Sequence, residues 1–178
     1  VTTAAICDGD GLNYIPTGDV AGTVYNWTSS VTAGTVTGNT ASGSGTISDV
    51  LVNSLTTVGT VRYVITPTFN GCVGSSINYD VTVNPTPVLS STLTPADICS
   101  YTATSGAAGT PTFAWSRAVV LGISESATSG TGNISETLTN TTTAAIAVTY
   151  VYQTTSNGCT GPVENVVVMV NPNPVLSS

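Results

Sequence analysis

The fold is decided by the stretch GTISDVLVNSLTTVGTVRYVITPTFNGCVGSSINYDVTVNPTPVLSS at residues 45–91, which recurs without a gap as GNISETLTNTTTAAIAVTYVYQTTSNGCTGPVENVVVMVNPNPVLSS at residues 132–178. The offset is a constant 87 residues, and 24 of the 47 aligned pairs are identical. Self-similarity at one period over a chain of 178 residues predicts two similar domains in tandem.

The repeat also sets the expected domain boundaries. We expect the first domain at residues 1–87, with a proline-rich junction at 84–87, and the second at residues 88–178, ending in the next junction at 171–178. Alternate prolines hold φ near about −65° and keep the preceding residue extended, so each junction should be short and stiff. Because the chain ends on the residues that open its own linker, we expect it to be an excerpt from a longer array.

Composition and strand pattern predict an all-β fold. Threonine occurs 34 times, and β-branched residues punctuated by Gly and Pro favour pleated strands over helices. Residues 77–84 alternate apolar and polar side chains, as a strand with one buried and one solvated face does. Asn-Gly pairs at 70–71 and 157–158 predict tight turns, because both residue types tolerate positive φ. We expect about seven strands in each domain.

Two tryptophans occupy matching places on a middle strand of each repeat, Trp27 in VYNWTSS and Trp115 in TFAWSRA. A cysteine, a tryptophan on a central strand and a second cysteine after a turn are typical of an immunoglobulin-like β-sandwich. We therefore expect both indoles in the core. The alternative is an exposed platform on which sugars stack.

The four cysteines predict one disulfide in each repeat. Four cysteines allow three pairings, and because each repeat should be self-sufficient, we expect Cys7–Cys72 and Cys99–Cys159. Zinc is the alternative, but the chain has no histidine and no Cys-x-x-Cys spacing. Disulfides form in oxidising compartments, so these pairs predict a secreted or cell-surface protein.

The charge balance argues against several classes of function. The net charge is −7 with two cationic residues, whereas binding to nucleic acid or to an anionic membrane surface needs clusters of Lys and Arg. No run of about 18 apolar residues is present, so we expect no membrane insertion. The chain has no His or Lys to act as base or nucleophile, and its nine carboxylates form no matched pair in the sequence. We therefore expect a protein that is not an enzyme.

One short segment is a candidate for binding calcium. CDGDGLN places Asp8 and Asp10 two residues apart with Gly11 next, as in an oxygen-rich calcium loop. No acidic residue closes the far end of the loop, and the matching stretch from Cys99 carries no acid. An ordinary polar turn is the expected alternative, so we expect no cofactor unless calcium binds here.

One strand face differs between the repeats. The outward positions Asp80 and Thr82 correspond to Val167 and Met169 in the second repeat. Exposed apolar residues where the twin is polar can mark a contact surface. We expect Val167 and Met169 either to contact another unit or chain, or to be covered by a neighbouring strand.

The closing segments VTVNPTPVLSS and VMVNPNPVLSS, the IC dipeptides that open the units, and the run W…GNISETLTNTTT…VTYVY…NGC resemble PKD-like repeats. Such repeats occur in very large secreted surface proteins of Bacteroidota, including gliding-motility adhesins and other exports of the type 9 secretion system. The resemblance covers essentially the whole chain and fits the second repeat better than the first. It implies a scaffold and brings no catalytic residues.

We therefore expect a non-catalytic structural segment of an extracellular bacterial filament, stalk or adhesin, acting as a semi-rigid spacer. Its partners would be neighbouring repeats of the same chain or further copies in a filament. Two alternatives remain: a subunit that self-assembles through an edge strand or the proline-rich tail, and a module that binds surface glycans or proteins.

Overall fold

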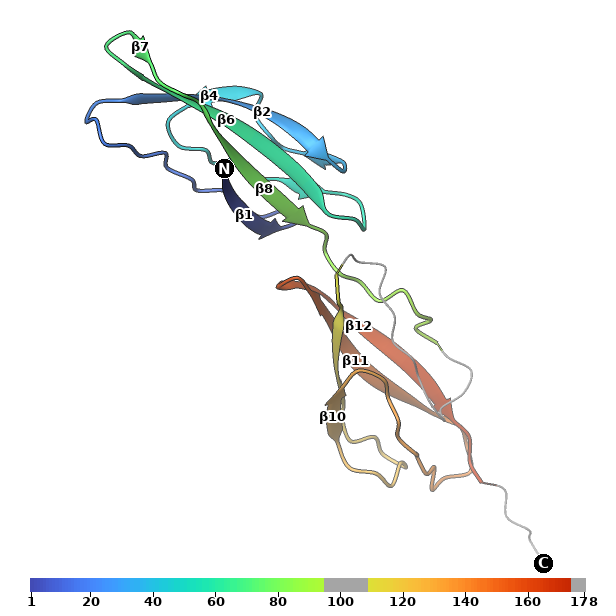
Figure 1. Cartoon of the computed structure of the whole chain (residues 1–178). Coiled ribbons are helices and arrows are strands. Elements are labelled where there is room, and N and C mark those ends of the chain that lie inside the picture. The colour runs from blue at the N-terminus through green and yellow to red at the C-terminus, as the bar shows by residue number, and fades with distance from the viewer. Residues whose placement is uncertain (95–108, 174–178) are drawn as a thin grey trace, which may run out of the picture. The chain divides into compact units, whose positions relative to one another are not determined.

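The computed structural model describes residues 1–94 and 109–173. The chain divides into two compact units, Val1–Thr86 (unit 1) and Pro87–Ser178 (unit 2), next to the boundary expected between residues 87 and 88. Every regular element in the described residues is a β-strand, which confirms the prediction of an all-β fold (Figure 1). Across the same residues, no helix is long and apolar enough to cross a membrane.

Eight strands belong to unit 1 and four to the described part of unit 2. In chain order they are β1 (Thr2–Cys7), β2 (Val24–Ala33), β3 (Val36–Thr37), β4 (Ser42–Ser44), β5 (Val52–Asn53), β6 (Gly59–Phe69), β7 (Cys72–Val73), β8 (Ile77–Asn84), β9 (Thr112–Arg117), β10 (Thr128–Thr131), β11 (Ile146–Ser156) and β12 (Cys159–Val170).

Unit 1 is built on a six-stranded sheet. Its order is β1–β8–β6–β2–β4, with β7 paired to the end of β6, and β3 and β5 form a separate two-stranded sheet. Strand β1 runs parallel to β8, whereas the other pairs are antiparallel. Two bridges, Gly11 to Val50 and Tyr14 to Ile47, tie together the irregular stretches that cover the main sheet.

The described part of unit 2 repeats the centre of this sheet. Its four strands have the order β10–β9–β11–β12 and are all antiparallel, as are β4, β2, β6 and β8 of unit 1. A tight turn at the Asn-Gly pair joins β6 to β7 in unit 1 and β11 to β12 in unit 2. Asn70 and Asn157 have φ of 47° and 51°, and the glycines after them also have positive φ. This confirms the predicted turns, because few other residue types accept such angles.

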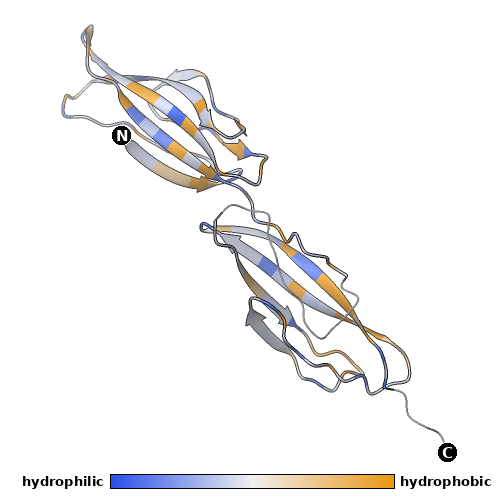
Figure 2. Ribbon diagram, turned by 45° about the vertical axis from the view of Figure 1, so that its right-hand side comes forward, coloured by the Kyte–Doolittle hydropathy of each residue, from blue (hydrophilic) through white to orange (hydrophobic). Residues whose placement is uncertain are grey.

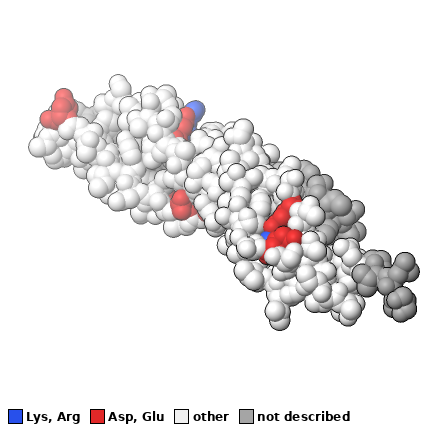
Figure 3. All heavy atoms as spheres, turned by 90° about the horizontal axis from the view of Figure 1, so that it is seen from below, with Lys and Arg blue, Asp and Glu red and all other residues white. Residues whose placement is uncertain are grey.

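Side chains alternate along the strands between the core and the solvent. Figure 2 shows hydrophilic and hydrophobic residues alternating along the central strands of unit 1, as a strand with one buried face requires. Charged groups are sparse on the outside: the face shown in Figure 3 is almost entirely uncharged, with a few small groups of acidic side chains. That face therefore offers few charged groups to a partner.

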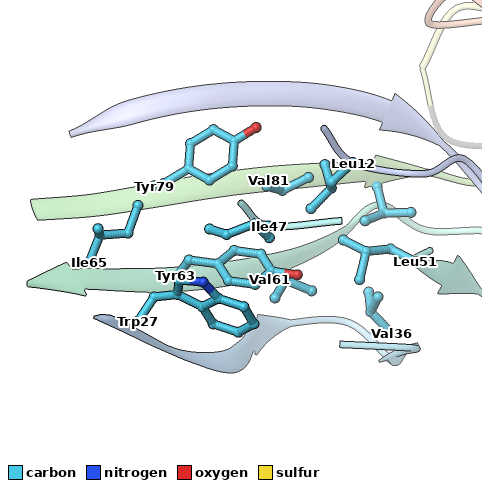
Figure 4. Packing of buried hydrophobic residues seen from close by; sticks show 11 residues of the cluster. Leu12, Trp27, Val36, Ile47, Leu51, Val61, Tyr63, Ile65, Tyr79 and Val81 are labelled. Carbon is cyan, nitrogen blue, oxygen red and sulfur yellow. The ribbon is translucent and has the colours of Figure 1, made fainter. Parts of the chain in front are cut away.

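Each unit has its own hydrophobic core. In unit 1, Val61, Tyr63 and Ile65 of β6 face Ile47 and Leu51 from the covering layer, and all five are almost completely buried (Figure 4). The equivalent positions of β11 and β12 form the core of unit 2. Two separate cores are what two domains in tandem require.

Candidate functional site

Trp27 lies inside the core of unit 1. Its indole, on β2, meets the ring of Tyr63 on β6 edge-on, with the ring centroids 5.6 Å apart and the planes at 76° (Figure 4). It also lies over Gly43 of β4, where a Cβ atom would come within 2.3 Å of the indole carbon Cζ2. Position 43 must therefore stay glycine for the indole to keep this place.

The same arrangement recurs in unit 2. Trp115 is half-buried on β9 and meets Tyr150 edge-on at 5.7 Å and 73°. A Cβ atom on Gly130 of β10 would come within 2.6 Å of this indole. Both tryptophans therefore pack between strands rather than offering a flat ring face to a sugar.

Tyr63 and Tyr150 each donate a hydrogen bond to a carboxylate that was not among the residues predicted from the sequence. In unit 1 the Tyr63 hydroxyl donates to Asp49 Oδ2 at 2.7 Å, and the hydroxyl of Thr40 donates to Asp49 Oδ1 at 2.7 Å. Burial, with the hydrogen bond to Asp49, raises the pKa of Tyr63. The repeat alignment contains the signal for this pair, because it matches Asp49 with Glu136 and Tyr63 with Tyr150.

Unit 2 adds a buried arginine to the pair. The Tyr150 hydroxyl donates to Glu136 Oε2 at 2.6 Å, and the Arg117 guanidinium donates to both oxygens of the same carboxylate. The Arg117 side chain has no exposed surface, and it also donates to the carbonyl oxygens of Ala118 and Ser126. Burial opposes ionisation of Glu136, but the bonds from Arg117 and Tyr150 lower its pKa.

These carboxylates and their donors form closed structural clusters. A general acid or base needs a pKa near the working pH and access to a substrate. Glu136 instead has a lowered pKa and is occupied by Arg117 and Tyr150. The chemistry of this cluster is that of a buried ion pair that fixes the position of a loop.

A buried asparagine ties a loop to the last strand of each unit. Asn53 Nδ2 donates to the carbonyl oxygens of Val83 at 2.9 Å and Thr57 at 2.8 Å. Its Oδ1 accepts from the backbone N–H of Leu55 at 3.1 Å. Asn140 makes the same three bonds at positions shifted by 87 residues. Both amides thus satisfy neighbouring backbone groups, which explains polar side chains in the interior.

The two calcium candidates bond to groups of the protein itself. Asp8 Oδ1 accepts from the backbone N–H of Asn53 at 2.8 Å, and its Oδ2 accepts from the Thr86 hydroxyl at 3.1 Å. Asp10 Oδ2 accepts from the backbone N–H of Cys7 at 3.1 Å. In the described parts of the chain, no group of three or more His, Cys, Asp or Glu side chains is placed to hold a metal ion.

The predicted Cys7–Cys72 disulfide is wrong. Cys72 is a free, exposed thiol, whereas Cys7 takes part in a disulfide. Cys7 pairs with Asn84 at one end of the sheet, and Cys72 pairs with Phe69 at the opposite end of β6. Since β6 has 11 residues, the two cysteines lie roughly 30 Å apart at about 3.3 Å per residue. A disulfide needs Cα atoms within about 7 Å of each other.

The second predicted disulfide, Cys99–Cys159, falls outside the described residues because Cys99 does. Cys159 is buried at the start of β12 and takes part in a disulfide. Disulfide bonding of Cys7 and Cys159 still favours an oxidising compartment.

The candidate contact residues of β12 are partly covered. The backbone N–H of Val167 donates to the carbonyl oxygen of Leu93 at 2.8 Å, so the segment before residue 94 lies against this strand edge. Val167 is half-buried and Met169 is 50% exposed. Their unit 1 counterparts are polar, and one of them, Asp80, forms an ion pair with Arg62 at 2.7 Å.

A cleft lies at the end of unit 1 that carries the β6–β7 hairpin. It encloses about 480 Å³, within the range of sites that hold ligands. Its lining comes from residues 14–25, 65–69 and 72–77 and is mostly apolar. Val73 and Ile77 in this lining are 71% and 45% exposed. Sequence analysis missed the cleft because its walls come from stretches that are far apart in the chain.

Comparison with known proteins gives one family and two distant folds. A sequence profile described as a PKD-like domain matches residues 4–87 and 97–174, and no curated protein matches the chain. Mouse cadherin-23 EC22–24 is similar over 98% of this chain, at 10% identity and a TM-score of 0.37, and this chain spans 64% of that structure. The D0–D1 domain of intimin is similar over 92% of this chain and 94% of its own, at 15% identity and a TM-score of 0.32.

Proposed function

Because the chain belongs to the PKD-like domain family, we propose that it is a non-catalytic repeat segment of an extracellular bacterial filament, stalk or adhesin. In this role the two units act as a semi-rigid spacer. The clusters around Asp49 and Glu136 support a structural protein, because their acidic groups are engaged in holding loops.

The observation that carries the proposal is the shortness of the junction. The Thr86 hydroxyl donates to Asp8 in unit 1, and the backbone N–H of Leu89 donates to Glu164 in unit 2 at 2.7 Å. Two residues separate these anchoring points, and the first of them is Pro87. Proline fixes φ, so few torsions are left for bending. A short, restricted linker suits a spacer better than a flexible tether.

The surface and the disulfide bonding of two cysteines support an extracellular location. Two cations among 178 residues, and the largely uncharged face in Figure 3, suit a stalk that does not attract anionic molecules. Disulfide bonding of Cys7 and Cys159 suits an oxidising environment. The resemblance to repeats of secreted surface proteins of Bacteroidota supports the same location and a bacterial source.

Small-angle X-ray scattering tests the spacer role. The chain is compared with a variant that carries a Gly-Ser insert between Pro87 and Val88. A semi-rigid spacer gives a distance distribution with two resolved maxima, one within the units and one between them, and the insert blurs the second. If the chain and the insert variant give the same broad distribution, the proposal is wrong. Antibody labelling of intact source cells tests the location: cells that stain only after permeabilisation contradict it.

A further inference from the structure

The first and the last main strand of unit 1 lie side by side and run in the same direction. Strand β1 pairs with β8 over six residues, from Thr2 opposite Tyr79 to Cys7 opposite Asn84 (Figure 1). The chain therefore enters this paired stretch at one end and leaves it at the other. A pull on both ends of unit 1 acts along the two strands, so the bonds between β1 and β8 share the load and must break together.

Alternate backbone groups of β1 face β8. The N–H of Asp8, just past the end of β1, donates to the carbonyl oxygen of Asn84 at 2.8 Å. The N–H of Cys7 donates instead to the side chain of Asp10. Neighbouring residues of a paired strand present their backbone groups to opposite sides. The N–H of Ala4, four residues before Asp8, therefore points to β8, and the N–H of the next residue points away from it.

A packed core shields one face of the paired stretch from water. Val81 and Val83 of β8 are completely buried, and Ala4 and Ile6 of β1 pack against the same core. A hydrogen bond is stronger in such surroundings than in water, which competes for its donor and acceptor. The bonds between β1 and β8 are therefore well placed to resist a pull.

Asp8 fastens the far end of the stretch. Its Oδ2 accepts from the hydroxyl of Thr86, which follows β8, and its Oδ1 accepts from the backbone N–H of Asn53. Asn53 is buried, and its Nδ2 donates to the carbonyl oxygen of Val83 on β8. Sliding β1 along β8 must break these bonds too, because they tie the end of β1 to β8 and to the residues beyond it. In the sequence of the second repeat, Ser100 takes the place of this aspartate.

We propose that unit 1 bears tension along the chain through shear of β1 against β8, with Asp8 as the lock at the end of the paired stretch. The inference rests on the proposed function, because a stalk or an adhesin is pulled at both ends when it holds a target. It also goes beyond that function. A spacer needs only to keep its length and direction, whereas a load-bearing unit must stay folded while it is stretched.

Single-molecule force spectroscopy of the full chain tests the proposal with two pulling geometries. One handle is attached to the N-terminus, and the other to an azide-bearing residue that replaces either Val88 or Cys72, which are both exposed. Position 88 follows unit 1, so this pull shears β1 against β8. Cys72 lies beyond Ile77, at the end of the sheet where β1 begins, so a pull there peels β1 away one bond at a time. Reductant is present, because the disulfide of Cys7 would otherwise carry part of the load.

Two matched pairs of variants show which groups carry the load. Ala4→Pro removes an N–H that points to β8. Ala5→Pro makes the same change one residue further on, where the N–H points away from β8 and proline is tolerated. Asp8→Ala removes the lock, and Asp19→Ala, in the exposed stretch before β2, is its control.

We expect unit 1 to unfold at a severalfold higher force in shear than in the peeling geometry. Forced unfolding is governed by the unfolding rate and not by equilibrium stability, so the effect of each variant depends on whether its bond lies in the sheared stretch. In shear, Ala4→Pro and Asp8→Ala should lower the unfolding force, whereas Ala5→Pro and Asp19→Ala should leave it unchanged. If Ala4→Pro does not fold, the two geometries of the unaltered chain still test the role of β1, and the Asp8 pair still tests the lock.

Equal unfolding forces in the two geometries overturn the proposal, because the bonds between β1 and β8 would then not share the load. An Asp8→Ala variant that unfolds at the force of the unaltered chain overturns the role of Asp8. A low force in shear leaves the scattering result unchanged, since the stiffness of the junction does not depend on the strength of unit 1. Failure of this proposal and failure of the spacer role are therefore distinguishable.

Discussion

Replacing Arg117 by methionine should destabilise unit 2 through the loss of one buried charge. Methionine keeps much of the side-chain volume but removes the donors to Glu136 and to the carbonyl oxygens of Ala118 and Ser126. The side chain of Arg117 has no exposed surface, so water cannot take its place without opening the core.

The expected loss of unfolding free energy depends on the charge of Glu136, which stays in the protein when Arg117 is replaced. Removing one partner of a buried ion pair costs about 3–5 kcal/mol, because the other charge is left without compensation. The Glu136 side chain is 16% exposed and keeps its bond from Tyr150, so part of its charge remains solvated. We therefore expect the lower end, about 3 kcal/mol of unfolding free energy. Arg117→Met/Glu136→Met should lose less than the two single changes together, because both charges leave the core.

Denaturant unfolding followed by tryptophan fluorescence measures this change. In a Trp27→Phe background Trp115 reports on unit 2 alone. Arg62→Met is the matched control, because its pair with Asp80 lies at the surface with 40% of the Arg62 side chain exposed, and exposed pairs contribute little. A loss below about 1 kcal/mol for Arg117→Met, or additive losses in the double variant, would refute the reasoning.

Four further changes test other parts of the structure. Gly43→Ala should lower the unfolding free energy by about 1–3 kcal/mol, because the added methyl group overpacks the facing indole. Gly11→Ala is the control and should leave the melting temperature unchanged, since its Cβ atom would meet its nearest neighbour at 3.7 Å. Equal melting temperatures for the two variants would contradict this. Asn140→Ala should cost about 2–3 kcal/mol in denaturant unfolding, since it leaves buried backbone groups without partners; an unchanged midpoint contradicts it. Maleimide should modify Cys72 in the folded monomer, as peptide mass mapping would show, and an unmodified Cys72 peptide would contradict its exposure. A backbone N–H and a serine hydroxyl lower the pKa of Glu125 from 4.5 to about 2, so its stabilising effect should be complete above pH 4.5 and disappear as the pH falls toward 2; Glu125→Gln should flatten this part of the stability profile, and an unchanged profile contradicts the assignment.

Local signals predicted the secondary structure and the turns well. The alternation along residues 77–84 became β8, and the Asn-Gly pairs became turns with positive φ. Both depend on neighbouring residues only, since the strand period and the steric preferences of Asn and Gly do not need the rest of the fold.

Pairing across the sheet was not predictable in the same way. Cys7 and Cys72 of the first repeat have counterparts in Cys99 and Cys159 of the second, yet the parallel course of β1 beside β8 puts Cys7 and Cys72 at opposite ends of the sheet. Likewise, the partners Arg117 and Glu136 are 19 residues apart. Glu136 lies in the irregular stretch between β10 and β11, so the packing of that stretch against β9 brings the two side chains into contact, and no spacing rule for a single strand contains it.

The sequence by itself determined that the chain is all-β, that it consists of two repeats, and that a proline-rich segment joins them. These properties follow from periodicity and from the backbone preferences of single residues. The tertiary structure alone decided which carboxylates meet a tyrosine or an arginine, and which cysteine stays free. The physical reason is that such contacts join residues distant in the chain, so they depend on strand order and register, which arise only when the sheets pack.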